Sequence, residues 1–138
     1  MNTKLYKKVH TQAIELLKAA DAENDDMFQK LYEELRQLCV DNETVDRMNH
    51  PVQWETLADF TEDSDQAQLY YQKALTSAKE VQANDYLASI YYALAQIQCE
   101  LNNSKEAVEL AVLANKHAAK IADKELKAEV KALLKSLE

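Results

Sequence analysis

The stretch YYALAQIQCELNNSKEAVELAVLA, residues 91–114, decides the fold class. It contains no Gly and no Pro, and one short polar break divides it. Its small residues are spaced for a helix: Ala95 precedes the break, and Ala107, Ala111 and Ala114 follow it. Residues three and four apart lie on one face of a helix, and small side chains on that face let a second helix approach closely. The stretch therefore predicts two closely packed helices joined by a short turn.

The composition of the whole chain extends this prediction. The 138 residues include no Gly and a single Pro, Pro51. Strand-rich folds need Gly or Asn in turns of positive φ, so a Gly-free chain favours helices joined by short polar turns. The length suits one domain with a core of its own. We therefore expect a single all-α domain over residues 1–138.

Apolar periodicity and turn residues predict seven helices. The first carries an apolar stripe of Tyr6, Val9, Ala13, Leu16, Leu17 and Ala20. Pro51 opens the third helix, and Asn103 with Glu106 resembles a capping box at the start of the sixth. The expected ranges are about 3–20, 26–40, 51–60, 64–82, 84–101, from 103 or 104 onward, and 123–137.

Two of the predicted helix pairs share one spacing of residues. The later pair reads Tyr91-x2-Leu94-Ala95, then Ala107-x3-Ala111-x2-Ala114, and the earlier pair reads Trp54-x2-Leu57-Ala58, then Ala67-x3-Tyr71-x2-Ala74. Ala67 and Ala107 are 40 residues apart. A weaker third copy, without the alanines, places Phe28, Tyr32 and Leu35 at the second-helix positions.

This spacing resembles the tetratricopeptide repeat, with Ala at the consensus Gly positions and an extended period of about 40 residues in place of 34. The resemblance implies antiparallel helical hairpins stacked as a short solenoid. Residues 11–50 would form a divergent repeat, 51–83 and 84–122 two further repeats, and 123–138 a capping helix. The apolar stripe of the last helix suits either that cap or a homodimer surface.

The resemblance also implies a concave groove, lined by the first helix of each repeat, that binds a peptide or partner protein. The residues expected to line it are Glu55, Asp59, Glu62, Ser89, Tyr92 and Gln96. The Lys, Asn and Arg with which some family members clamp a terminal carboxylate are not at the matching positions. Carboxylates there favour a partner with basic residues, although all six also suit an ordinary solvated helix face. The expected function is an adaptor or chaperone-like interaction module, and the alternative is a structural protein that forms a homodimer through its C-terminal helix.

The charge of the chain bears on its partners. The net charge is −8, which disfavours binding to nucleic acid. Residues 21–66 hold 14 acidic against 3 basic side chains, a balance of −11, which suits either solubility or a functional acidic face. We expect no membrane segment, because no apolar run approaches about 18 residues. The charged, amphipathic N-terminus does not resemble a secretory signal, so a cytoplasmic location is expected.

Residues suited to catalysis or metal binding are few. His10, His50 and His117 take part in no H-x3-H or E-x2-H pair, so we expect surface histidines and no metal site. Cys39 and Cys99 are expected to stay reduced as small apolar residues. No Gly-rich phosphate loop or nucleophile motif is present, so we expect neither a cofactor nor an enzyme.

Overall fold

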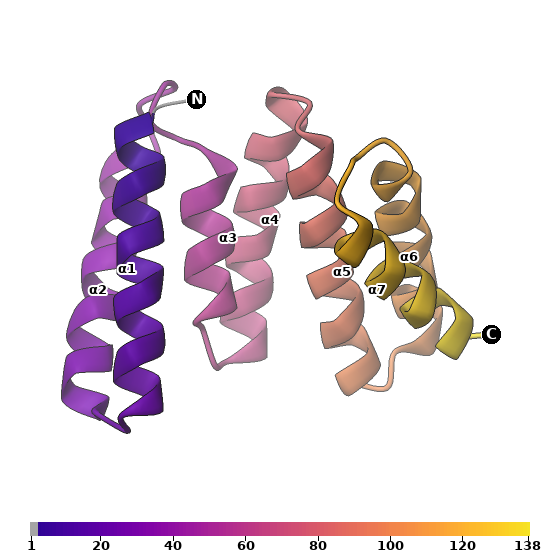
Figure 1. Ribbon diagram of the computed structural model, residues 1–138, viewed down its shortest axis with the longest axis horizontal. Helices are drawn as coiled ribbons and strands as arrows, with labels where there is room; N and C mark the ends of the chain where they lie inside the picture. The colour runs from indigo at the N-terminus through magenta and orange to yellow at the C-terminus, as the bar shows by residue number, and fades with distance from the viewer. Residues whose placement is uncertain (1–2) are drawn as a thin grey trace. The chain divides into compact units, whose positions relative to one another are not determined.

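The computed structural model describes residues 3–138, and within this range the chain forms helices and no strands. The helices are α1 (Thr3–Asp21), α2 (Asp25–Asn42), α3 (Pro51–Asp59), α4 (Ser64–Glu80), α5 (Asn84–Glu100), α6 (Ser104–Ala118) and α7 (Lys124–Ser136) (Figure 1). The predicted all-α class is confirmed, and the described helices begin and end within about two residues of the expected positions.

The chain divides into two compact units, one ending at Ser77 and the other running from Ala78 to Glu138. The first unit contains α1, α2, α3 and most of α4. The second begins in the last turn of α4 and contains α5, α6 and α7. The predicted repeat boundaries at residues 51 and 84 coincide with the starts of α3 and α5.

In the first unit, α1 packs against α2 and α3, and α2 also packs against α3. The predicted stripe of α1 is wrong in part, because Tyr6, Leu17 and Ala20 are exposed. The buried line alternates spacings of four and three along the helix: Leu5, Val9, Gln12, Leu16 and Ala19. This line includes the polar Gln12, which apolar periodicity alone does not select.

A polar network fixes the connector between α2 and α3. The Oδ1 atom of Asn49 accepts hydrogen bonds from Nε1 of Trp54 at 2.7 Å and from Nε2 of Gln53 at 3.3 Å. The hydroxyl of Ser77 in α4 donates to the backbone carbonyl of Asn49 at 2.7 Å. Gln53, Trp54 and Ser77 are all buried, so these bonds satisfy polar groups that water cannot reach.

The predicted capping box at the start of α6 is wrong. Asn103 makes no side-chain capping bond, and its Nδ2 atom donates instead to Oε1 of Gln98 at 2.8 Å. An unexpected cap occurs at α3, where Nδ1 of His50 accepts from the backbone amide of Val52 at 3.1 Å. Which side chain satisfies a helix end thus depends on neighbours that the local sequence does not reveal.

In the second unit, α5 and α6 pack along their lengths, and α7 lies against α6 and, to a smaller extent, α5 (Figure 1). Ala95, Ala107, Ala111 and Ala114 are all 0% exposed. Their small size lets the two helices approach closely. On α7 only Val130 is fully buried, and the other members of its apolar stripe are half-buried: Leu126, Leu133, Leu134 and Leu137.

Candidate functional site

The predicted groove residues of the first unit differ in their surroundings. Glu55 is half-buried in α3, and Glu62 is exposed in the turn that follows it. Asp59 accepts a 2.5 Å hydrogen bond from the hydroxyl of Tyr71 in α4. Although part of Asp59 is open to solvent, lost hydration of its carboxyl raises its pKa, and the Tyr71 hydrogen bond offsets some of this effect. Asp59 is therefore already engaged inside its own unit.

The predicted groove residues of the second unit lie on α5. Ser89 and Tyr92 are half-buried and Gln96 is exposed. The amide of Gln96 donates to the hydroxyl oxygen of Tyr92 at 3.3 Å, one turn of helix away. Since the six predicted residues are divided between the two units, a single groove that contains all of them stays a prediction.

A cleft with acidic and aromatic walls lies in the first unit, between the α1–α2 turn and the α3–α4 turn. It consists of two hollows of about 240 and 470 Å³ that share Phe28, Gln29 and Glu62. We call this region the acidic cleft. Its further lining residues are Ala20, Glu23, Asp25, Tyr32, Phe60, Thr61, Asp63 and Gln66.

Aromatic rings form one wall of the acidic cleft. The ring of Phe28 lies 6.2 Å from that of Phe60 in an edge-to-face arrangement and 6.4 Å from that of Tyr32 in a stacked one. The hydroxyls of Tyr32 and Thr61 are hydrogen-bonded at 2.7 Å. Burial raises the pKa of Tyr32, so this phenol is neutral at physiological pH. The Tyr32–Thr61 hydrogen bond and the Phe28–Phe60 ring contact thus join α2 to the end of α3.

Carboxylates form the rim of the acidic cleft. Glu23, Asp25, Glu62 and Asp63 are all exposed, and none of the described lining residues is Lys or Arg. A cation that enters such a cleft gains from the carboxylates and from the faces of the rings. The arrangement is thus suited to a guanidinium or ammonium group.

Of the predicted site residues, only Glu62 lines the acidic cleft. The sequence-based prediction of the site did not include the aromatic residues Phe28, Tyr32 and Phe60, although the weaker third copy of the spacing contains two of them. Phe28 and Tyr32 align with Ala67 and Tyr71, which are buried, yet both residues of the weaker copy are half-buried. Phe28 places a bulky ring where the other copy has the small Ala67, and such a replacement indicates that the packing of this helix pair differs.

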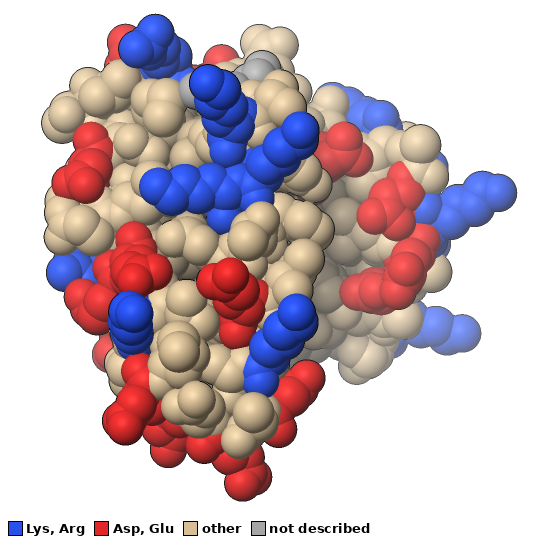
Figure 2. All heavy atoms as spheres, turned by 60° about the vertical axis from the view of Figure 1, so that its left-hand side comes forward, with Lys and Arg blue, Asp and Glu red and all other residues tan. Residues whose placement is uncertain are grey.

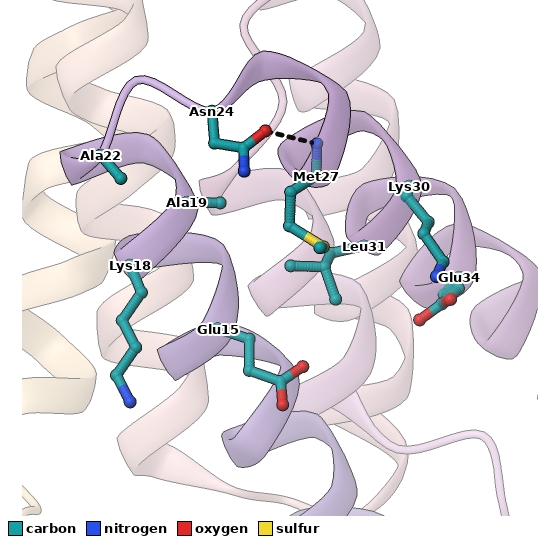
Figure 3. Close-up of a pocket in the computed structure, with 9 residues that line it drawn as sticks. All are labelled: Glu15, Lys18, Ala19, Ala22, Asn24, Met27, Lys30, Leu31 and Glu34. Atoms are coloured by element: carbon teal, nitrogen blue, oxygen red, sulfur yellow. Dashed lines mark hydrogen bonds between the residues drawn. The ribbon is translucent and has the colours of Figure 1, made fainter.

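A second concave region lies between α1 and α2, with a volume of about 560 Å³. Figure 3 shows Met27 and Leu31 of α2 in the space between the helices, with Glu15 and Lys18 projecting from α1. Lys30 and Glu34 complete the charged rim, so two basic and two acidic side chains surround an apolar floor. We call this region the α1–α2 groove.

The two thiols differ in their surroundings. Cys39 is buried and donates from Sγ to the backbone carbonyl of Gln53 at 3.3 Å, and Cys99 is half-buried. Burial raises the pKa of the Cys39 thiol to about 12, so it carries almost no thiolate at neutral pH. Among residues 3–138, no group of three or more His, Cys, Asp or Glu side chains is placed to hold a metal ion. In the same range, no helix combines the length and the apolar character needed to cross a bilayer.

Comparison with known proteins adds no relative. No family model, curated protein or solved structure matches the chain significantly.

Proposed function

We propose that the protein is a protein–protein interaction module built from tetratricopeptide-like repeats, with α3–α4 and α5–α6 as two repeats and α7 as a cap. The burial of the repeat residues supports this reading, because signature positions in both pairs belong to the core: Trp54, Leu57, Ala58, Ala67, Tyr71, Ala74, Tyr91, Leu94, Ala95, Ala107, Ala111 and Ala114. The residues that set the spacing therefore serve packing and leave other positions for a partner. Two free cysteines suit a reducing compartment, and we place the protein in the cytoplasm.

The acidic cleft carries the proposal for how a partner is recognised. A Lys or Arg side chain of a partner segment enters between Phe28 and Glu62 and places its cationic group among the rim carboxylates. The ring faces attract the cation, and the carboxylates accept its hydrogen bonds. The partner is therefore a protein with an exposed basic segment, which extends the basic preference expected for the groove.

Binding of a short basic peptide tests this function. The probe is a fluorescent pentapeptide with blocked ends and two arginines, and its control has glutamine in place of both arginines. We expect the arginine peptide to bind with a Kd of about 0.1–1 mM at low salt. The Glu62→Gln/Asp63→Asn variant should bind about fivefold more weakly, since two exposed charge pairs contribute about 1 kcal/mol together. Fluorescence anisotropy measures both affinities.

A matched variant separates this site from the general acidity of the chain. Glu109→Gln removes one exposed carboxylate from α6, far along the chain from the cleft, and should leave the affinity unchanged. Equal loss in Glu109→Gln, or equal binding of the glutamine peptide, would contradict the proposal. Glu62 and Asp63 are better targets than Asp59, because replacing Asp59 would break its hydrogen bond to Tyr71 and perturb the fold.

A further inference from the structure

The α1–α2 groove continues along the helix pair beyond the region in Figure 3. A neighbouring hollow of about 330 Å³ is lined by Lys8, Gln12, Gln37, Leu38 and Asp41, and it shares Glu34 with the larger hollow. The two hollows together follow the line between α1 and α2. All the residues that line the two hollows belong to α1, α2 or the turn between them, so no other described helix lines this side of the pair.

Gln12 lies at the middle of the α1–α2 groove. It is the central residue of α1 (Thr3–Asp21), it lines the smaller hollow, and it is only 9% exposed. Its Oε1 atom is buried and accepts no hydrogen bond from any residue in the range 3–138. A buried acceptor without a partner costs about 1–3 kcal/mol, so a turn of the Gln12 carboxamide into the groove, toward an N–H donor, would relieve this cost.

The two ends of this face differ in net charge, while the groove between them is lined by both signs, with Lys18 and Lys30 in the larger hollow and Asp41 in the smaller one. Figure 2 shows basic side chains gathered near the top of the face, acidic side chains along its lower edge, and both signs between them. The upper end contains the exposed Lys4, Lys7 and Lys8 at the start of α1. The lower end contains the α1–α2 turn with its exposed carboxylates: Asp21, Glu23, Asp25 and Asp26. A face of this kind is complementary to a copy of itself turned by 180°.

We propose that the α1–α2 groove is covered by a second copy of this chain, with a two-fold axis that passes close to Gln12. The lysine end of each copy then faces the acidic end of the other, and the apolar floors formed by Ala19, Met27 and Leu31 face the partner's helices. In this dimer the two Gln12 carboxamides turn out of their own chains toward the axis, where each supplies the N–H that the other lacks. Four helices, two from each copy, form the interface.

The spacing along α1 predicts one cross-copy ion pair. Lys8 lies four residues before Gln12 and Glu15 lies three residues after it. At about 1.5 Å of rise per residue, the axis brings Lys8 of one copy to within about 2 Å of the level of Glu15 in the other. The dimer therefore contains this pair twice, once on each side of the axis.

A charge exchange tests the proposed dimer. Sedimentation velocity at about 5 to 200 μM protein should show wild-type species approaching twice the 15.8 kDa monomer mass as concentration rises. Glu15→Lys and Lys8→Glu should each raise the dimer Kd at least about tenfold, because like charges then meet twice. The double variant should return the Kd to within about threefold of wild type, since the pair is restored in reverse. Glu109→Lys on α6 is the charge control and should have no effect.

Other outcomes overturn the proposal. A wild-type chain that stays monomeric throughout this range excludes the dimer. A dimer that both single exchanges leave intact, and that Leu134→Lys on α7 dissociates, places the interface on α7 instead. Far-UV circular dichroism of every variant verifies that the helices are retained.

Cross-linking provides a second test that does not depend on charge. In a Cys99→Ser background, Gln12→Cys should form an intermolecular disulfide with oxidised glutathione, because the axis brings the two side chains together. Val112→Cys, at an exposed position of α6, should stay monomeric under the same conditions. Equal cross-linking of both variants contradicts the proposed axis. None of these tests uses the acidic cleft, so their failure is distinct from failure of the proposed function.

Discussion

Three of the residues in the range 3–138 adopt left-handed backbone conformations where most proteins would use glycine. They are Glu23, Gln82 and Asn102, with φ values of 54°, 51° and 62°. Each follows the end of a helix, and the amide of the next residue donates to the carbonyl five residues back at 2.9–3.0 Å. This is the Schellman arrangement, in which glycine is preferred because it has no Cβ to clash with the backbone. A chain without Gly therefore carries a small conformational cost at each of these turns.

Gln82→Gly should stabilise the protein. The side chain of Gln82 is exposed, and its φ of 51° costs a residue with a Cβ more than it costs glycine. We expect the free energy of unfolding to rise by about 0.5–1 kcal/mol, measured by urea denaturation.

Gln72→Gly is the matched control, because this exposed glutamine lies in the interior of α4. There glycine should lower the free energy of unfolding by about 1 kcal/mol. If both substitutions destabilise the chain equally, the left-handed turn at Gln82 carries no such cost.

At the scale of the elements, the connector between α2 and α3 depends on one side chain. Asn49 satisfies both the indole N–H of Trp54 and the amide of Gln53, and both of these side chains are buried. Lys73 of α4 adds an ion pair to Glu43 and lies 5.0 Å from the centre of the Trp54 ring. The start of α3 is thus fixed to α4 by polar contacts as well as by packing.

Asn49→Ala should destabilise the first unit by about 2 kcal/mol, because two buried donors lose their acceptor. Urea denaturation followed by the fluorescence of Trp54, the only tryptophan of the chain, measures this change where it occurs.

Asn49→Asp keeps an acceptor oxygen at the same position and should lose less than half as much stability. Equal losses in the two variants would show that the hydrogen bonds to Oδ1 do not hold the connector.

At the scale of the whole molecule, we expect repulsion among carboxylates to outweigh attraction between ion pairs. The net charge is −8, and the printed sequence concentrates 14 acidic against 3 basic residues in positions 21–66. The ion pairs of Arg36 with Glu33 and of Lys73 with Glu43 lie at the surface, where such pairs contribute little. Added salt screens the repulsion between carboxylates and should therefore stabilise the folded chain.

Raising NaCl from about 20 to about 200 mM should raise the thermal midpoint by a few degrees, since the Debye length falls to below 10 Å. Circular dichroism at a fixed low protein concentration measures this shift. The affinity for the arginine peptide should fall over the same range, because that interaction is attractive. A thermal midpoint that falls with added salt would contradict the dominance of repulsion.

Most of the helical framework could be predicted from the sequence. Helix positions follow from hydrogen bonds between residues four apart and from apolar periodicity, both of which are local. The absence of Gly, the position of Pro51 and the spacing of the small residues therefore predicted where the seven described helices lie. The same features predicted that Ala107, Ala111 and Ala114 would be buried.

Side-chain surroundings were decided by the tertiary structure. The acidic cleft needs Phe28 and Phe60, which lie 32 positions apart and meet only when α2 packs against the end of α3. Contacts between helices also bury Gln12 of α1 and place Asp59 where it accepts a hydrogen bond from Tyr71 of α4. The sequence by itself thus determined which segments are helical, because that choice is local. Only the folded chain decided which polar groups and rings share a site, because those contacts join residues distant in sequence.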